Sequence, residues 1–419
     1  MFNLIASTYF WAASKVKATT GSLGGNAKVF IATQLFFSVP AVWFATYWAL
    51  FLVELGAGKE YIGYLASILI AVQVLVSFFS VFISERFGHK HTYIAVSVIC
   101  WPAAIMSYAL SGNALLASLA IIVNNMFMLA DPSFVFLFIK GIKKEGTHSA
   151  FAVLNILFTG ASFFSPVAGF FIKKLGIIDG GRLVFIAGSV MMSLSLAIRA
   201  FLIEEPAGHK QVKHLSFKEY KKTFISIVKN SYFVRILILD TLMMFNMTVI
   251  NTYSAIYLTD RSTIALDSSL ISYFPSINAV FNIIVSLLIV PGIKIKETKK
   301  YLRIAMLAGI LAWGILLLAP KGNFLFVAVT YAFHGLWFAL YFPLIMGLLL
   351  SFIGKARKEV YFSVFNVFAL SASIPAGAIA GKMYVRDPKL PFMLVTFIFA
   401  VTLLAINKIL PVTKGIKRL

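Results

Sequence analysis

The sequence has little cysteine and little acidic charge. Of its 419 residues, one is cysteine and 15 are aspartate or glutamate, whereas 37 are lysine or arginine. Cys100 lies inside a predicted membrane span, so no disulfide can form within the chain and no cluster of thiolate metal ligands is available. The chain also lacks a phosphate-binding loop ending in Gly-Lys-Ser or Gly-Lys-Thr, so ATP-driven pumping is not supported. We therefore expect no cofactor and no metal site.

Charged residues are scarce because apolar side chains dominate the chain. Hydrophobic residues make up 60% of it and charged residues 12%, whereas a soluble globular protein is about 45–50% apolar. The apolar residues form runs of about 18 or more, long enough to cross a hydrocarbon core about 30 Å thick, without the alternation of β-strands. The composition therefore predicts an all-α membrane protein.

The apolar runs predict twelve transmembrane helices. They lie near residues 28–54, 61–83, 92–111, 114–139, 149–173, 182–203, 233–258, 267–292, 301–319, 323–351, 360–383 and 391–411. If the N-terminus is cytoplasmic, most lysines and arginines fall in cytoplasmic segments, as the positive-inside rule requires. The sequence thus predicts a multi-pass protein of the plasma membrane with both termini in the cytoplasm. Topology explains the net charge of +22 better than nucleic-acid binding does.

One long basic loop divides the spans six and six. We expect an N-terminal six-helix bundle over 28–203 and a C-terminal six-helix bundle over 233–412, joined by a basic cytoplasmic linker with an amphipathic helix over 204–232. Residues 1–27 are predicted to form a cytoplasmic or interfacial segment, and residues 413–419 a cytoplasmic tail.

A short repeat connects the two predicted bundles. Phe151–Asn155 and Phe362–Asn366 share the pattern Phe-x-Val-x-Asn at a separation of 211 residues, and Ala161-Ser162 matches Ala372-Ser373 at the same separation. Since this separation is half the chain, it equates the fifth span with the eleventh and indicates that the bundles are repeats.

The loop after the second predicted span carries a family signature. Glu85, Arg86, Gly88 and Lys90 supply an acidic residue, a basic residue, a glycine and a further basic residue in order. This resembles the signature of the major facilitator superfamily at the same loop, although its leading glycine is Val81 here. The resemblance implies the twelve-helix fold of that family and a gating role for these four residues on the cytoplasmic side. A turn that needs the backbone freedom of Gly88 is the structural alternative.

The fifth span also resembles a signature of exporters in that family, through Pro166 and Gly169, with Ser165 in place of a glycine. Small residues let helices approach closely, and Pro375 and Gly377 stand in the eleventh span. We predict Pro166, Gly169, Pro375 and Gly377 to be helix-packing positions.

Ionisable residues within the spans are the candidates for binding protons or another coupling cation. An acid at a helix centre costs about 2.5–3.5 kcal/mol on insertion scales, so acids at such positions are functional candidates. The candidates are Asp131, which precedes Pro132, together with Asp240 and His334. A hydrogen bond or ion pair that holds helices together is the alternative for each, and Arg235 or Lys229 is the expected partner of Asp240.

Polar and aromatic residues in the spans are expected to line a substrate cavity. These residues are Gln34, Trp43, Tyr47, Asn124, Asn155, Asn246, Asn251, Asn278, Asn282, Trp337, Tyr341 and Asn366. No span has a lysine or arginine near its middle, and Arg199 is close enough to a helix end to extend to the membrane surface. Because an anionic substrate normally meets a buried cation, we expect a neutral, weakly cationic or amphipathic small molecule.

Secondary active transport by alternating access is the function that these residues favour. We expect a monomer surrounded by membrane lipids. Its transport is expected to be either proton-coupled export of the multidrug type, by antiport, or nutrient uptake by a symporter or uniporter. An enzyme is not expected, because the acids and His334 lie in separate spans without the spacing of metal ligands or of a nucleophile and its base. A non-transporting sensor or scaffold remains the third class.

Overall fold

The computed structural model describes residues 24–140, 142, 147–205, 225, 229–294, 297–352 and 358–409. Every regular element in these residues is helical, so the all-α prediction is confirmed for this part of the chain. The predicted N-terminal segment is described only from residue 24, and most of the predicted linker and the whole C-terminal tail lie outside the described residues.

The first group of helices comprises α2 to α9. Its members are α2 (Gly25–Glu54), α3 (Lys59–Phe87), α4 (His89–Val98), α5 (Ala104–Ala109), α6 (Ala114–Asn125), α7 (Asp131–Ile139), α8 (Thr147–Gly160) and α9 (Ser165–Leu202). A π-helical turn, η1 (Ile99–Ala103), joins α4 to α5, and 3-10 turns join α6 to α7 through η2 (Met126–Leu129) and α8 to α9 through η4 (Ala161–Phe164). Within α9, Gly176 has a φ of 79°, so two helices meet there at a kink.

The second group comprises α11 to α17. Its members are α11 (Ser231–Thr259), η5 (Ser268–Ser272), α12 (Tyr273–Leu288), η6 (Val290–Gly292), α13 (Thr298–Leu318), α14 (Phe324–Phe352), α15 (Lys358–Ser373), α16 (Pro375–Arg386) and α17 (Leu390–Ile409).

Many of these helices are suited to cross a membrane. In the described residues eight segments are long and apolar enough, or nine if the bent pair α6 and α7 forms one span. One of the eight, Ala150–Leu202, has 53 residues and contains the Gly176 kink. At about 1.5 Å per residue, it is more than twice as long as a hydrocarbon core is thick. The chain is thus a multi-pass membrane protein, and the total of twelve spans stays a prediction.

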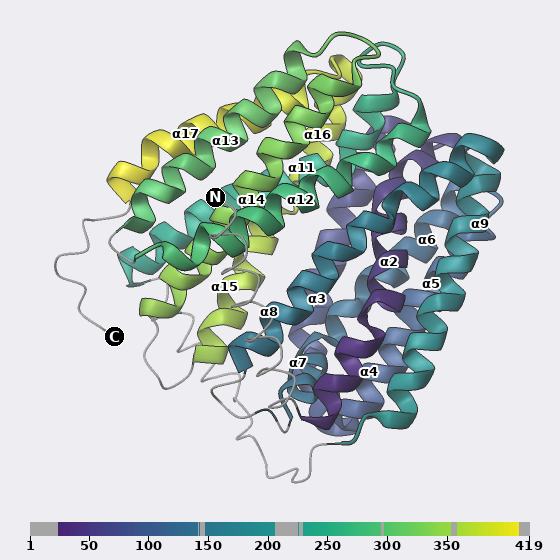
Figure 1. The fold of residues 1–419 in the computed structure, drawn as a ribbon, viewed down its shortest axis with the longest axis vertical. Helices are drawn as coiled ribbons and strands as arrows, with labels where there is room; N and C mark the ends of the chain where they lie inside the picture. The colour runs from purple at the N-terminus through teal and green to yellow at the C-terminus, as the bar shows by residue number, and fades with distance from the viewer. Residues whose placement is uncertain are drawn as a thin grey trace, which may run out of the picture.

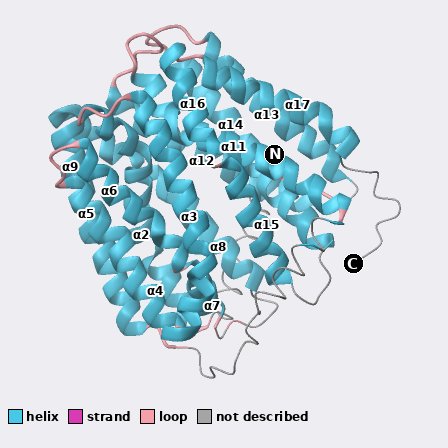
Figure 2. Cartoon of the chain, turned by 180° about the vertical axis from the view of Figure 1, so that it is seen from behind, coloured by secondary structure: helices cyan, strands magenta, loops and turns pink. Residues whose placement is uncertain are grey.

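The two groups lie side by side and lean against each other. Helices α2 to α9 occupy one side of the molecule and α11 to α17 the other, and both views show them converging at one end and diverging toward the other (Figures 1 and 2). We call the end that contains Lys59 and Asp260 the closed end. The opposite end, which contains Gly25, Gly88 and Glu205, is the linker end.

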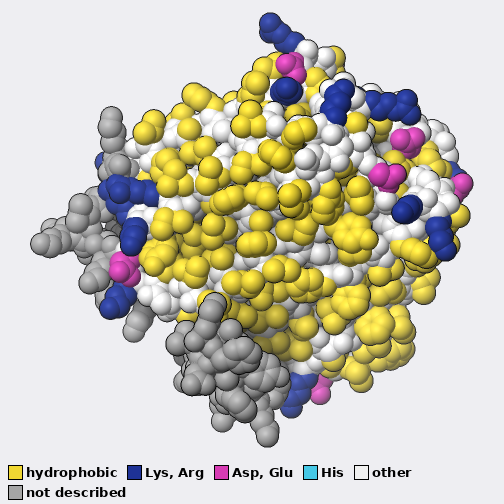
Figure 3. Space-filling view, turned by 45° about the horizontal axis from the view of Figure 1, so that its top comes forward, with side chains coloured by type: hydrophobic (Ala, Val, Ile, Leu, Met, Phe, Trp, Pro, Cys, Tyr) yellow, Lys and Arg dark blue, Asp and Glu magenta, His cyan; other side chains and the backbone are white. Residues whose placement is uncertain are grey.

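The surface has the distribution expected of a protein embedded in lipid. Apolar side chains cover the middle of the face in Figure 3, and lysines and arginines gather at its margins. Large apolar residues such as Phe79, Phe82 and Leu75 are more than half exposed. Because the hydrocarbon core accepts such side chains and excludes charges, this pattern agrees with the membrane assignment.

Candidate functional site

An ion pair joins the two groups of helices at the closed end. Lys59, the first residue of α3, places its Nζ 2.5 Å from Oδ2 of Asp260, which directly follows α11. The hydroxyl of Tyr384 also donates to Oδ2, at 3.1 Å, while the backbone N–H and hydroxyl of Ser262 donate to Oδ1. Burial raises the pKa of Asp260, but hydrogen bonds from Lys59 and Ser262 and the charge of Lys59 outweigh it and lower the pKa to about 2. Asp260 is therefore ionised and paired at neutral pH.

Tyr253 strengthens the same junction. Its hydroxyl donates to the backbone oxygen of Lys59 at 2.8 Å, and its ring stacks on Tyr384 with centroids 5.0 Å apart. The ammonium of Lys59 lies 5.5 Å from the centroid of the Tyr384 ring, within range of a cation–π attraction. Lys59 is thus held by a carboxylate, an aromatic face and a bond to its backbone, all from the other group.

Glycines allow the helices to approach closely next to this junction. A methyl group on Gly377 of α16 would lie 2.5 Å from the backbone oxygen of Gly63 and 2.8 Å from Cβ of Ala66, both in α3. A methyl group on Gly169 of α9 would collide with Ser272 Oγ and lie 2.5 Å from the backbone oxygen of Ser269. Two of the predicted packing positions therefore lie where the groups touch.

Pro166 and Pro375, the other predicted packing positions, occupy the first turns of α9 and α16. Each follows an interruption of a span, where the missing proline N–H costs no helical hydrogen bond. The predicted fifth and eleventh spans thus share a break and a glycine contact beyond it, as repeats would.

Further hydrogen bonds cross the same border. They run from Tyr47 Oη to the backbone oxygen of Ser268 (3.1 Å), from Ser276 Oγ to the backbone oxygen of Ser162 (2.8 Å), and from the backbone N–H of Ala378 to Ser67 Oγ (2.9 Å). Ser67 and Ser276 lie within the first third of α3 and α12, counted from the closed end. Within the described residues, the polar contacts between the groups are thus confined to the closed-end half.

A buried arginine lies inside the first group. Arg199, in the last turn of α9, is 1% exposed, which overturns the expectation that it extends to the membrane surface. Its guanidinium donates to Thr33 Oγ1 (2.8 Å), Tyr93 Oη (2.6 Å) and Gln34 Oε1 (3.1 Å). The faces of Phe30 and Phe37 lie 5.0 and 5.1 Å from it. The side chain turns inward because neutral acceptors and aromatic faces together satisfy a charge that bare hydrocarbon would not.

The linker end of the first group is fastened at Glu204 and Glu205. The carboxylate of Glu205 accepts the backbone N–H groups of His89 (2.9 Å) and Lys90 (2.7 Å), the first two residues of α4. Gly88, with a φ of 84°, makes the turn into α4 and lies beside this carboxylate. A carboxylate at a helix N-terminus satisfies free N–H groups and complements the helix dipole.

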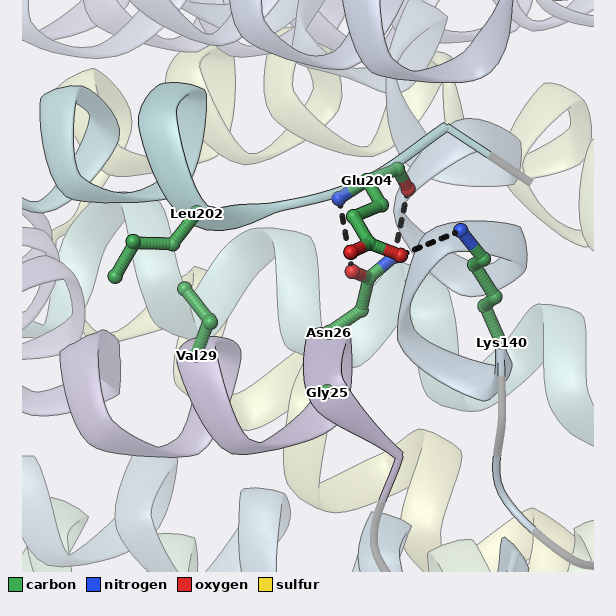
Figure 4. Close-up of a pocket in the computed structure, with 6 residues that line it drawn as sticks. All are labelled: Gly25, Asn26, Val29, Lys140, Leu202 and Glu204. Atoms are coloured by element: carbon green, nitrogen blue, oxygen red, sulfur yellow. Dashed lines mark hydrogen bonds and ion pairs between the residues drawn. The ribbon is translucent and has the colours of Figure 1, made fainter. Parts of the chain in front are cut away.

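A shallow pocket of about 340 Å³ lies beside this turn, between the ends of α2, α7 and α9 (Figure 4). Asn26 binds the backbone of Glu204 through both amide atoms, at 2.9 and 3.0 Å. Lys140 reaches the carboxylate of Glu204 at 3.3 Å and the backbone oxygen of Glu205 at 2.6 Å. These contacts fix the point where the chain leaves the first group.

The predicted gating residues lie around this turn. The guanidinium of Arg86 lies 5.5 Å from the ring centroid of its neighbour Phe87, and in the described residues it forms no ion pair. The side chain of Glu85 lies outside the described residues. The gating role of Glu85, Arg86, Gly88 and Lys90 therefore stays a prediction.

Asp131 lies at a break in its span. Helices α6 and α7 meet at 44°, and Asp131 and Pro132 form the first turn of α7. The bend interrupts the helix between Asn124 and Asp131, so these two residues do not lie on one continuous helical face. The Asp131 side chain is exposed, whereas Asn124 is buried and donates to the backbone oxygen of Cys100 at 2.7 Å. Asn124 thus supports the π-helical turn η1.

Asp240 and Tyr341 meet inside the second group. Asp240 is 2% exposed, and its Oδ1 accepts a hydrogen bond from the hydroxyl of Tyr341 at 3.2 Å. Neither Arg235 nor Lys229 pairs with it, so the expected surface ion pair is wrong for the described residues. Tyr341 stacks on Trp337, and Trp337 contacts His334, so the three side chains form a column along one face of α14. His334 is buried among Trp313, Tyr331 and Trp337.

The other predicted cavity residues are placed in three ways. Gln34, Trp43, Tyr47, Asn246 and Asn282 are buried; Asn278 is half-buried; Asn155 and Asn251 are exposed. Gln34 and Tyr47 have the partners given above, while Trp43 donates to the backbone oxygen of Phe164 and Asn246 to that of Val395. The side chain of Asn366 lies outside the described residues. Their contact with a substrate stays a prediction.

Several residues of the site had no clear signal in the sequence. Lys59 and Asp260 are 201 residues apart in the sequence, and only their opposite charges at the same predicted side of the membrane indicated a pair. The last-turn position of Arg199 suggested the surface, and Glu205 is one of two adjacent acids at the start of a basic loop. No group of three histidine, cysteine, aspartate or glutamate side chains among the described residues could hold a metal ion.

Solved structures of several membrane transporters share this fold. The chain matches the nucleoside transporter NupG with a TM-score of 0.71 at 15% identity, covering 92% of this chain and 99% of that one. It matches a D-xylose-proton symporter with a TM-score of 0.72 at 16% identity, covering 94% and 99%. A POT family transporter in complex with a thioalcohol-conjugated peptide gives a TM-score of 0.73 at 13% identity, covering 93% and 98%. At these identities the matches show the fold.

No curated protein matches the sequence at a significant level. The family model of the Major Facilitator Superfamily, in contrast, matches residues 29–378, which is most of the chain and spans both groups of helices. The resemblance carried by the loop at Gly88 is thereby confirmed, and the protein is a transporter and not an enzyme. The chain belongs to the major facilitator superfamily.

Proposed function

We propose that the protein moves a small neutral, weakly cationic or amphipathic molecule by alternating access, and that this structure is the state open at the linker end, toward the cytoplasm. The observation that carries the proposal is that the polar contacts between the described residues of the two groups lie in the closed-end half. A transporter must break such contacts at one end when it forms others at the opposite end. The ion pair between Lys59 and Asp260 is the contact to be broken here.

The position of Arg199 supports the proposed substrate charge. Among the described residues of the first group, its guanidinium is the fully buried cation, but three neutral acceptors and two aromatic rings enclose it. A substrate anion would have to displace these partners to reach it. The exposed polar residues Asn155, Asn251 and Asp131 instead suit an uncharged or weakly basic compound.

The direction of transport depends on the gradients that act on this cycle. The same pair of states serves export by antiport and uptake by symport, because the order of loading and release is set by which side supplies substrate and proton. The similar structures include a nucleoside transporter, a D-xylose-proton symporter and a POT family transporter in complex with a thioalcohol-conjugated peptide. We use these classes of compound as the first test set.

The proposal is tested by binding and flux on the same preparation. The purified protein is screened by thermal shift against a nucleoside, a pentose, a dipeptide and a lipophilic cation, since a ligand of the folded state raises its apparent stability. Each compound that binds is then followed into or out of proteoliposomes, with and without an imposed pH gradient. We expect flux above that of empty liposomes. A compound that binds and is not moved in either direction would identify a sensor or scaffold instead.

A further inference from the structure

The second group of helices contains a set of buried polar atoms without partners. They include Asp240 Oδ2 and Asn246 Oδ1 in α11, Trp313 Nε1 in α13, and His334 Nδ1 and Trp337 Nε1 in α14. Native structures leave few buried polar atoms unsatisfied, so each one calls for an explanation. Asp240 is the only acid in this set, and its free atom is the one whose charge would be hardest to bury.

Among the described side chains, no cation lies close enough to Asp240 to compensate its charge. Tyr341 donates to Oδ1, and His334 lies about two turns away along α14. The described side chains of α15 and α17 include no charged residue, and those of α2, α3 and α16 carry charge only toward their ends. In this part of the chain no ion pair involves Asp240, and Arg235 on its own helix does not reach it.

An ionised carboxylate in this position would be buried without a counter-charge, whereas a neutral carboxylic acid would lose only one hydrogen bond. Burying an ionised carboxylate without a counter-charge costs far more free energy than the loss of one hydrogen bond. The geometry also separates the two oxygens. Tyr341 occupies Oδ1, and its ring is held by Trp337, with centroids 5.7 Å apart and planes at 21°. Oδ2 is left as the atom that can carry a proton.

We propose that Asp240 is the proton-binding site of this transporter, with Tyr341 as the residue that positions its carboxyl group. A proton from water adds to Oδ2 and converts the carboxylate into a neutral acid, and its return to water on the other side restores the carboxylate. No other bond changes. In this structure the site is closed to water, because Asp240 is 2% exposed, so uptake and release require the movement of the helices around it. This inference rests on the proposed transport function.

Infrared spectroscopy of the full-length protein in lipid tests the site without a known substrate. At neutral pH the wild-type protein should show a carbonyl band of a buried neutral carboxylic acid, and Asp240→Asn should abolish that band. Asp387→Asn is the matched control, because Asp387 is an exposed acid in the turn between α16 and α17. It should leave the band unchanged.

Tyr341→Phe keeps the proposal testable if Asp240→Asn does not fold. Loss of the hydrogen bond to Oδ1 should shift the band of the neutral acid without removing it. A wild-type protein with no such band, an identical band in Asp240→Asn, or an unshifted band in Tyr341→Phe would each overturn the proposal. The result is separable from transport, because a protein that moves no substrate would still show the band, and a transporter without this proton site would lack it.

Discussion

Lys59 and Asp260 form an ion pair across the two groups of helices, with Nζ and Oδ2 2.5 Å apart. The two residues flank different spans, the start of α3 and the end of α11, so the pair exists only when the groups meet at this end. It is surrounded by Tyr253 and Tyr384 and lies next to the glycine contact between Gly63 and Gly377. Charge, aromatic packing and backbone contact therefore stabilise the same state.

Removal of this ion pair should weaken the closed end. We expect Lys59→Met and Asp260→Asn to shift the equilibrium toward opening by roughly 0.2–1 kcal/mol, up to about fivefold, because Lys59 is partly exposed. Spin labels at Glu54→Cys and Lys321→Cys, in a Cys100→Ser background, would report the distance across this end by electron paramagnetic resonance. Glu54 and Lys321 are exposed and lie on opposite groups. Lys382→Met, an exposed lysine of α16 outside the pair, should leave the distances unchanged.

The same contact should respond to acid. The pKa of Asp260 is lowered from 3.8 to about 2 in the closed state, so its carboxylate favours closure above pH 4. This contribution is lost as the pH falls from about 4 toward 2, because protonation then removes the charge that Lys59 meets. In the wild-type protein the distances between the labels should shift to larger values as the pH falls from about 4 toward 2. Asp260→Asn should show no such acid response, and an identical response in that variant would assign it to other groups.

A side chain at Gly377 should prevent closure more strongly than loss of the ion pair. A methyl group there would lie 2.5 Å from the backbone oxygen of Gly63, and backbone atoms cannot move aside as a flexible side chain would. We expect Gly377→Ala to cost about 1–3 kcal/mol in the closed state, as overpacking does in protein cores. Gly314→Ala is the control, since nothing lies within 4 Å of its added methyl group. Equal label distances in the two variants would refute the packing argument.

The hydroxyl of Tyr93 should contribute to stability through Arg199. In Tyr93→Phe a guanidinium N–H that donates at 2.6 Å is left unpaired inside the bundle. The expected loss is about 1–3 kcal/mol in the free energy of unfolding, because Arg199 cannot reach water. Thermal unfolding in detergent would measure it. Tyr64→Phe, which removes an exposed hydroxyl bonded to Glu60, should change the unfolding temperature little.

Glu205 should hold the turn at Gly88 and the start of α4. Glu205→Ala removes the acceptor of the N–H groups of His89 and Lys90, and loss of such a cap costs about 0.5–2 kcal/mol of helix stability. Hydrogen exchange should therefore become faster at these two amides. Glu204→Ala, whose carboxylate pairs with Lys140 at the surface, should leave their exchange unchanged.

Much of the fold was predictable because the bilayer imposes long apolar helices. The all-helical fold and the family signature at Gly88 follow from local patterns of hydropathy and charge. The break at Pro132 was also predictable, because proline removes a helical hydrogen bond. The 44° bend at this break was not predictable, because the size of the bend depends on how α6 and α7 pack against their neighbours.

The candidate site was less accessible to sequence reasoning because its contacts link distant segments. From their places along a helix, Asp240 was expected to pair with a basic residue at the surface, and Arg199 was expected to extend to the membrane surface. Burial reversed both assignments, because Tyr341 and Tyr93 approach from other helices and offer hydrogen bonds inside the bundle. The position of a residue along a helix defines the helical face on which it lies, but only the packed structure shows which side chains of other helices contact that face.

The central claim, that the two groups exchange closure between the two ends, is tested most directly by measuring both ends in one preparation. Distances between labels at Glu54 and Lys321 report the closed end, and distances between labels at the exposed residues Phe87 and Leu288 report the linker end. In wild-type protein in lipid we predict a short distance across the closed end and a long one across the linker end. Gly377→Ala should reverse both. Distances that change at one end while the other stays fixed would contradict alternating access.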